Sequence, residues 1–284
     1  MYFSAHVPDH IRSTATFYYQ MRKGAMEPDH PGELLMPSGT GILAFHLQGR
    51  YHVSALAFFD GELPKNYLIG QQTVSYRLWV EEDTDIFGIA LHPTSAWKMT
   101  GVPSYQLTNS PTDPYTLFPT KYHPFLKAIE ESENFEQRCK SGNTLLEFFQ
   151  AEHSPQKTLV DYALDLIFEK KGCLSTRNLC KELHVSERHL QHLFRQQIGV
   201  SPLQYARITR FNAIFVEFTR TEAPRDLGFL TSFYNYYDAS HFFKDFKAYS
   251  GEAPSQFHLE KFSLLKELVE KDPYLTQVQH LKSR

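Results

Sequence analysis

The sequence has few of the features that would place it in a specialised class of protein. It contains three cysteines, Cys139, Cys173 and Cys180, an odd number with no CxxC spacing. We therefore expect reduced thiols in a cytoplasmic protein rather than a disulfide framework. No apolar run approaches the ~18 residues that a membrane span needs. The N-terminus also lacks the basic and then apolar segments of a signal peptide.

Catalytic motifs are missing as well. The sequence has no GxSxG, HExxH, P-loop or Gly-rich dinucleotide turn, so it predicts no enzyme activity, no cofactor and no metal site. One alternative hypothesis rests on His46, His52 and His92, which lie in or near expected strands. It makes the N-terminal half a cupin-like small-molecule-binding domain or metal-dependent enzyme, with the helical half serving interactions. No HxH pair or carboxylate follows His46 and His52 at metal-binding spacing.

A strong positive charge is also absent. The net charge is −3, which on its face argues against a nucleic-acid partner. The distribution of charge matters more than its total. Residues 176–225 contain eight basic and four acidic side chains, so this segment carries a local charge of +4. The local excess of basic residues is compatible with DNA binding but does not establish it.

The 284 residues suggest two domains at ~150 residues each. Alternation and turn residues predict strands over 41–47, 51–54, 73–80 and 85–91, the first two joined as a hairpin through Gly49. Short strands at this spacing indicate a β-barrel or double-sheet roll. Helical segments follow at 123–130 and 144–149. We expect a β-rich sensing or oligomerisation domain over 1–150 and a polar, proline-containing linker over 151–157.

The clearest helix of the C-terminal half covers residues 186–198. Ser186 is a good N-cap, and Gly199 suits the left-handed residue that closes a helix. Ser201 and Pro202 then supply a new N-cap and first helical residue. The apolar residues recur at helical spacing and predict one buried stripe, made of Leu190, Leu193, Phe194 and Ile198. Arg188, Gln191, His192 and Arg195 project from the opposite face.

The same pattern returns 52 residues later. Asp238 takes the place of Ser186 as N-cap, and Gly251 takes the place of Gly199. The further correspondences pair His189–Leu190 with His241–Phe242, Phe194–Arg195 with Phe246–Lys247, Pro202 with Pro254, and Gln204–Tyr205 with Gln256–Phe257. A repeat that shares caps, buried positions and terminators describes one supersecondary unit used twice.

The surrounding segments complete two helix–turn–helix units. Thr158 caps a helix whose buried face we expect to contain Leu159, Tyr162, Ala163, Leu166 and Ile167. Ser175 or Thr176 starts a bracing helix, His184–Val185 forms the turn, and a long helix runs from Pro202 to about Thr219. The second unit begins near residues 225–227 and turns at 235–237. The predicted fold class is α+β. A β-barrel- or roll-like domain with a helical extension precedes an all-α domain of two such units over 158–260, and a helical tail over 261–284 breaks at Asp272–Pro273.

Residues 158–260 resemble the DNA-binding domain of AraC/XylS-type transcription regulators. The phrases that carry the resemblance are residues 185–191, Gly199–Val200–Ser201–Pro202, residues 205–210, residues 236–242, Phe246–Lys247 and Gly251–Glu252–Ala253–Pro254. Residues 87–93, 101–103 and 107–109 resemble, more loosely, the sensor domains attached to some members. The sequence departs from the family pattern at His192, Thr231, Asn235 and Ala239.

The resemblance implies a sequence-specific DNA-binding transcription regulator whose helices 186–198 and 238–249 enter adjacent major grooves. The expected DNA-contacting residues are Arg188, His189, Gln191, His192, Arg195, Ser240, His241, Phe243, Lys244 and Lys247. Arginine can pair with guanine and glutamine with adenine, so we expect the first helix to set sequence preference. We expect the second helix mostly to add affinity that does not depend on the DNA sequence. Arg207 and Arg210 could contact DNA or form structural ion pairs. Expected partners are double-stranded DNA, a small-molecule effector, a second copy of the chain and, for an activator, RNA polymerase.

Overall fold

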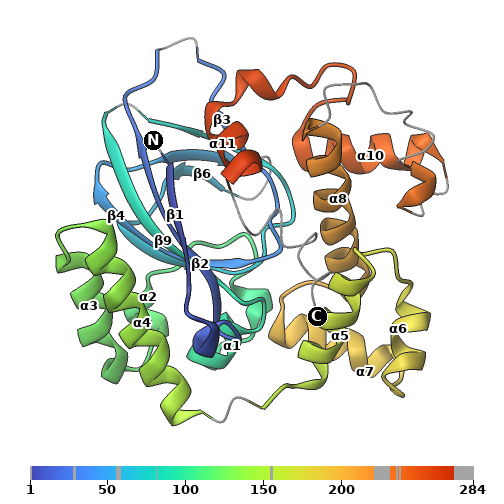
Figure 1. The fold of residues 1–284 in the computed structure, drawn as a ribbon, viewed down its shortest axis with the longest axis horizontal. Coiled ribbons are helices and arrows are strands. Elements are labelled where there is room, and N and C mark those ends of the chain that lie inside the picture. The colour runs from blue at the N-terminus through green and yellow to red at the C-terminus, as the bar shows by residue number, and fades with distance from the viewer. Residues whose placement is uncertain are drawn as a thin grey trace.

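The computed structural model describes residues 2–27, 30–55, 59–80, 82–153, 156–220, 231–234, 236 and 238–271. Its N-terminal half contains two antiparallel sheets (Figure 1). The five-stranded sheet has the order β1 (Tyr2–His6), β2 (Ala15–Lys23), β9 (Thr84–Leu91), β4 (Gly41–Gln48) and β7 (Asn66–Ile69). The four-stranded sheet has the order β3 (Glu33–Leu35), β8 (Tyr76–Trp79), β5 (His52–Ala55) and β6 (Phe59–Glu62).

The larger sheet is covered on both faces. β2 is buried at seven successive positions, from Ala15 to Met21, because one face packs on helices and the other on the second sheet. Phe17 and Tyr19 share an apolar cluster with Val53 and Leu78 of the smaller sheet. Tyr18, on the opposite face, packs in the cluster that includes the helices. The unbroken run of buried residues in β2 follows from burial on two sides.

The predicted hairpin around Gly49 is wrong. β4 pairs with β7 and β9, whereas β5 pairs with β6 and β8 in the other sheet. Gly49 has φ 53°, and its turn carries the chain from one sheet to the other. The strand expected over 73–80 is confined to β8. The two sheets do not close on each other, so the domain is an open double-sheet roll rather than a barrel.

Helices cover the outer face of the larger sheet. They are α1 (Ser95–Thr100), α2 (Pro114–Leu117), α3 (His123–Glu131) and α4 (Phe135–Glu152), with short 3-10 turns η1 (Asp9–Ile11), η2 (Ser104–Gln106) and η3 (Thr120–Tyr122). The predicted helical segment 144–149 is part of the longer α4. Because α4 extends to Glu152, the expected linker 151–157 starts within its last turn.

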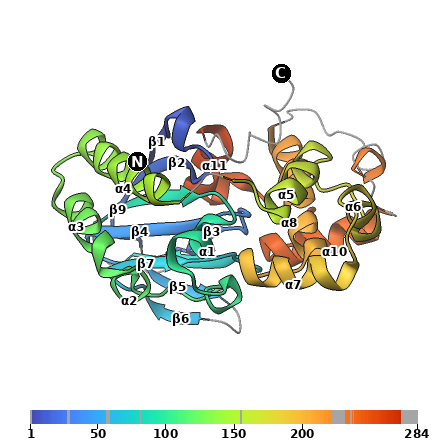
Figure 2. The same ribbon diagram turned by 90° about the horizontal axis from the view of Figure 1, so that it is seen from below.

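The C-terminal half is helical. It contains α5 (Leu159–Glu169), α6 (Thr176–Glu182), α7 (Glu187–Gln197), α8 (Pro202–Arg220), α10 (Ala239–Ser250), η4 (Leu259–Lys261) and α11 (Ser263–Lys271). Helices α5 to α10 lie beside the sheets, while α11 returns to the sheet domain (Figures 1 and 2). Most of the second unit's supporting helix, its turn residues Asn235 and Tyr237, and the tail from Asp272 lie outside the described residues. No helix within the described residues is long and apolar enough to span a membrane.

The buried face of α5 differs from the expected one. Thr158 is the N-cap, and its hydroxyl and the Asp161 carboxylate form a capping box. Tyr162, however, is 52% exposed. The buried residues are Val160, Asp161, Ala163, Leu164 and Ile167. The face shifts because α5 packs on α7 and α8 while Asp161 turns toward the sheet domain.

Helix α8 joins two apolar clusters. Tyr205 and Ala206 belong to the cluster of α5, α6 and α7, which forms the core of the first helix–turn–helix unit. Ile208 and Phe211 belong to a second cluster that contains α10, α11 and residues of β3. One helix therefore supports both units, as the sequence predicts.

Gly172 and Gly101 provide a matched test of this packing. Both have positive φ, 72° and 71°. A Cβ at Gly172 would lie 2.2 Å from Ala206 O and 2.6 Å from Arg210 N, both in the α8 backbone, whereas a Cβ at Gly101 would meet nothing within 4 Å.

We expect Gly101→Ala to lower the free energy of unfolding by ~1–2 kcal/mol, the cost of a left-handed alanine. Gly172→Ala should lose about 1–3 kcal/mol more, because backbone atoms of a helix cannot move aside cheaply. Urea unfolding of both variants measures the difference. Equal losses would contradict the packing of this turn on α8.

Candidate nucleic-acid interface

The first recognition helix, α7, has the limits that its sequence predicts. Ser186 Oγ accepts a hydrogen bond from His189 N at 3.3 Å, so Ser186 is the N-cap. Leu190 and Phe194 are fully buried, and Gly199 follows with φ 98°. The bracing helix α6 begins after Ser175, whose hydroxyl accepts from Asn178 N at 3.1 Å. These local interactions fix the orientation of α7 within the first unit.

The outer face of α7 is exposed. All five expected contact residues, Arg188, His189, Gln191, His192 and Arg195, are exposed. The first four lie in the N-terminal half of the helix, the part that contacts bases in helix–turn–helix proteins. Arg195 lies near the end of the helix, with its guanidinium 5.0 Å from the centre of the Tyr105 ring.

The second recognition helix, α10, repeats this construction. Asp238 Oδ1 accepts a hydrogen bond from His241 N at 2.8 Å, and Gly251 closes the helix with φ 79°. Phe242 and Phe246 are fully buried. The five residues that we expect to face DNA, Ser240, His241, Phe243, Lys244 and Lys247, are all exposed. The two helices therefore agree in caps and buried positions, and each exposes its expected set.

A buried carboxylate positions α10 against α8. Asp245 is 4% exposed and lies 2.5 Å from Arg207 Nη2 and 3.6 Å from Arg210 Nη2. Tyr236 Oη donates to the same carboxylate at 3.2 Å, and Arg210 lies over the Tyr236 ring. Because Arg207 donates to Asp245, the pKa of Arg207 is raised. Both arginines thus form structural ion pairs, one of the two roles that the sequence left open.

The C-terminal end of α7 also docks on the sheet domain. Ser104 Oγ donates to Gln197 O at 3.0 Å, and Thr108 Oγ1 donates to Gly199 O at 3.2 Å. Together with the stacking of Arg195 on Tyr105, these contacts hold the end of the recognition helix against η2. The docking segment, 104–108, overlaps residues 107–109, one of the stretches whose sequence resembles sensor domains.

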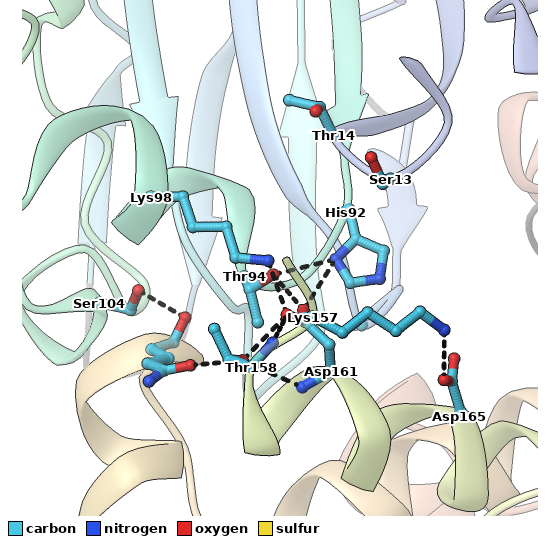
Figure 3. A network of polar contacts seen from close by, with 12 residues as sticks. Ser13, Thr14, His92, Thr94, Lys98, Ser104, Lys157, Thr158, Asp161 and Asp165 are labelled. Carbon is cyan, nitrogen blue, oxygen red and sulfur yellow. Dashed lines mark hydrogen bonds and ion pairs between the residues drawn. The ribbon is translucent and has the colours of Figure 1, made fainter. Parts of the chain in front are cut away.

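A second polar contact joins α5 to the sheet domain (Figure 3). Asp161, 4% exposed, accepts from Thr94 Oγ1 at 2.7 Å and from Lys98 Nζ at 2.7 Å. Burial alone would raise the pKa of Asp161, but hydrogen bonds from Lys98, Thr158 and Thr94 hold it below its usual value. His92 Nδ1 lies 3.9 Å from the same carboxylate, and burial lowers the pKa of His92 to about 4.

The three histidines of the alternative hypothesis are not brought together. His46 is buried, and its ring nitrogens contact Pro64 O at 3.1 Å and Tyr51 N at 3.4 Å. His52 lies in the other sheet beside Asp60, and His92 lies at the junction with α5. Within the described part of the chain, no three His, Cys, Asp or Glu side chains form a group that could hold a metal ion.

The N-terminal half also contains a cavity that sequence reasoning did not identify. It lies between the two sheets and has a volume of about 860 Å³, including its open mouth. Residues of β2, β4, β7, β8 and β9 line it, including Phe17, Tyr19 and Tyr67. Asn212 of α8 and Leu265 and Leu268 of α11 also line it. The aromatic residues of the strands were the available signal, but they do not distinguish a cavity wall from a filled core.

Helix α8 is anchored beside this cavity. Tyr205 Oη donates to Gly39 O at 3.0 Å, and Asn212 Nδ2 donates to Pro37 O at 3.0 Å and Ser38 O at 3.2 Å. Tyr205 and Asn212 are two helical turns apart and so share a face of α8. The helix that joins the two recognition units is therefore bound directly to the loop between β3 and β4.

Comparison with known families supports the C-terminal assignment. Residues 179–259 match a family model described as a helix-turn-helix domain, which is of the AraC type. The match covers both recognition helices and α8. The predicted AraC-type DNA-binding domain is confirmed. A search of curated proteins finds no match to this chain.

Several solved structures are similar to this chain at low identity. ToxT from Vibrio cholerae O395 matches over 88% of this chain and 97% of its own, with 12% identity and a TM-score of 0.45. ToxT from strain SCE256 with an unsaturated fatty acid bound matches over 84% and 92%, with 10% identity and a TM-score of 0.43. The AraC-like transcriptional activator CuxR matches over 74% and 84%, with 15% identity and a TM-score of 0.25. The functional conclusion rests on the domain match and the geometry.

Gly199 and Gly251 test the docking of α7. They follow the two recognition helices at corresponding positions, both with positive φ. A Cβ at Gly199 would lie 2.3 Å from Thr108 Oγ1 and 2.7 Å from Ser104 O, both in the sheet domain. At Gly251 the nearest atom is Ser75 Oγ at 3.7 Å.

Both alanine substitutions should therefore cost ~1–2 kcal/mol for the left-handed backbone. Only Gly199→Ala should release the end of α7, with faster amide hydrogen exchange in residues 104–109. Hydrogen exchange read by mass spectrometry measures this. If the two variants exchange equally fast there, α7 does not depend on this contact.

The junction should also respond to pH through His92. Unfolded His92 has a pKa near 6.5 and folded His92 a pKa of about 4, so the unfolded chain binds the proton first as pH falls. The free energy of unfolding should therefore decrease between pH 6.5 and 4, by up to about 3 kcal/mol from this group. Asp161 contributes a further loss only below its ordinary pKa of 3.8.

Urea unfolding at pH 7, 6, 5 and 4.5 tests this, with His92→Gln as the control. The variant should lose less stability than the wild type across the range. Parallel losses in the two proteins would show that His92 does not carry the effect.

Proposed function

We propose that this chain, which carries an AraC-type helix–turn–helix domain at residues 179–259, binds DNA with two recognition helices and is controlled by a small-molecule effector. The chain is a DNA-binding transcription regulator. The observation that carries the proposal is the matched pair of capped helices on α8, each exposing its expected contact residues. In this proposal the chain has no catalytic activity.

Helix α7 sets sequence preference. Arg188 and Gln191 are exposed in its N-terminal half, and these side chains can pair bidentately with guanine and adenine. His189 and His192 border them on the same helix. Arg195 lies later in the helix and contacts phosphate once it leaves the Tyr105 ring.

Helix α10 mostly contributes affinity that does not depend on the DNA sequence. It begins with Ala239 and exposes Ser240, which offers one hydroxyl to a base edge. Lys244 and Lys247 follow on the exposed face and suit phosphate contacts. His241 and Phe243 complete the set.

The spacing of the helices supports binding to adjacent grooves. The 19 residues of α8 span about 28 Å, close to the ~34 Å between major-groove faces on one side of B-DNA. α7 and α10 lie toward opposite ends of α8 (Figure 1). One chain thus spans two successive grooves.

The cavity between the sheets is the effector site of this proposal. Its wall includes Asn212 of α8 and Leu265 and Leu268 of α11, so a ligand there contacts both halves of the chain. Partners are double-stranded DNA and this effector, together with RNA polymerase if the regulator activates and a second copy if it binds as a dimer.

Arg188→Ala and Lys247→Ala should affect DNA binding in different ways. Loss of Arg188 should cost ~1–3 kcal/mol at a specific site and relax preference at one base pair. Loss of Lys247 should weaken binding to all sequences alike and reduce the slope of log K against log salt by ~0.9.

Binding to a randomised DNA library at several salt concentrations separates the two effects. No preference of the wild-type protein over random DNA at moderate salt would refute the function. A preference unchanged by Arg188→Ala would refute the residue assignment alone.

A further inference from the structure

The cavity between the sheets has an unusual lining for a site open to solvent. Its lining, taken over the described residues, contains no Asp, Glu, Lys, Arg or His. The polar lining groups are neutral amides and hydroxyls, contributed by Tyr19, Ser38, Thr40, Tyr51, Tyr67, Gln72, Tyr76 and Asn212. The remaining side chains are apolar.

Three tyrosine hydroxyls of this lining, those of Tyr51, Tyr67 and Tyr76, stay protonated at neutral pH. Burial raises the pKa of Tyr51 and of Tyr76 to about 12, and it raises the pKa of Tyr67 well above its usual value. These side chains therefore add neither a negative charge nor a proton source at physiological pH.

Lys23 is the cation placed nearest to the cavity along β2. It follows Phe17, Tyr19 and Met21 at alternate positions and so lies on the same face of the strand. Its ammonium is already engaged, because Lys23 Nζ lies 2.7 Å from Glu33 Oε1 and 2.8 Å from Ser263 Oγ. Glu33 is fully buried and neutralises this charge. Lys23 is thus not ready to pair with an acidic ligand.

Glu33 also binds the start of α11, the helix that contributes Leu265 and Leu268 to the cavity wall. Its carboxylate accepts from Leu264 N at 3.0 Å and from the Ser263 hydroxyl at 2.5 Å, in the first turn of α11. Leu265, the next residue, lines the cavity. The charges at this edge hold α11 in place rather than facing a ligand.

Asn212 supplies one unused acceptor. Its amide nitrogen must be the atom that faces Pro37 O and Ser38 O, because two carbonyl oxygens can only accept hydrogen bonds. The orientation of the amide is therefore fixed, and Oδ1 is the other terminal atom. Asn212 is 3% exposed, and Oδ1 is buried without a hydrogen-bond partner among the described residues. Its exposed area is below 1 Å², so a ligand in the cavity reaches this oxygen only when the lining shifts, and an unpaired buried carbonyl favours a shift that gives it a donor.

We infer that the cavity binds an uncharged, mainly apolar ligand with one hydroxyl or N–H group, and that binding shifts the lining so that this group donates to Asn212 Oδ1. This inference rests on the proposed effector site and names the chemical class of its ligand. The donor requirement links recognition of the ligand to α8, because Asn212 belongs to that helix. A carboxylate ligand is disfavoured since it would lose its hydration without gaining a cation.

The test compares three probes with the same alkyl chain on the full-length protein at pH 7.5. They are the primary alcohols from 1-hexanol to 1-decanol, the methyl ether of each, and the carboxylate with the same number of carbons. Isothermal titration calorimetry measures the affinities. We expect at least one alcohol to bind, at least tenfold more tightly than its carboxylate and at least fivefold more tightly than its ether.

A carboxylate that binds as tightly as its alcohol would overturn the neutral-ligand inference. An ether that equals its alcohol would overturn the role of Asn212 as acceptor. No binding by any alcohol would overturn both.

Two variants locate the site. Asn212→Leu should remove the preference for alcohol over ether, whereas Leu268→Trp should fill the cavity and abolish binding of both. Because the ether is compared within each protein, a moderate change in stability does not affect the Asn212 result. A preference that persists in Asn212→Leu would contradict the assignment.

Operator DNA measured beside the ligand separates this inference from the proposed function. A carboxylate that binds and shifts operator affinity would leave the effector function standing and refute the ligand class. An alcohol that binds without changing operator affinity would leave the ligand class standing and refute the effector function.

Discussion

The attachment of α8 to the loop between β3 and β4 is the constraint on which the arrangement of the molecule depends. Tyr205 and Asn212 bind the carbonyls of Gly39, Pro37 and Ser38 from one face of this helix. The ring of Tyr205 also packs against Phe194 of α7, and two arginines of α8 pair with Asp245 of α10. Both recognition helices are therefore positioned by a helix that also forms a wall of the cavity.

The two contacts between the halves differ in character. On the α11 side, Leu34 and Met36 of the sheet domain share an apolar cluster with Phe262 and Leu265. On the α7 side, the junction consists largely of hydrogen bonds to Gln197, Gly199 and Asp161. The neutral hydrogen bonds to Gln197 and Gly199 contribute only ~1 kcal/mol net each, so the end of α7 is easier to release than the ion pair of Asp161 with Lys98 or the apolar cluster. This difference suits a regulator in which one recognition helix is released while the other half of the junction stays closed.

The sequence could predict what is local and could not predict what is assembled from distant segments. Caps such as Ser186 and Asp238 depend on residues within one turn, and the 52-residue repeat made their pairing visible. The hairpin prediction at Gly49 failed because a strand's partner depends on the whole sheet. Asp161 belongs to the capping box of α5 and also accepts a hydrogen bond from Lys98, which is 63 residues away in the sequence. The capping role can be predicted from neighbouring residues, but the contact across the domain junction cannot. The expected contact residues are all exposed. The cavity could not be predicted because its wall combines strands with α8 and α11, which are distant in the sequence.

In the proposed function, one chain holds two recognition helices at the spacing of successive major grooves. Hydroxyl-radical footprinting on a selected site, at a measured stoichiometry, tests it most directly. The account predicts two protected patches one helical turn apart, ~10 base pairs, on the same face of the duplex with one chain bound. A single patch per bound chain, with the second appearing only when a second chain binds, would contradict it.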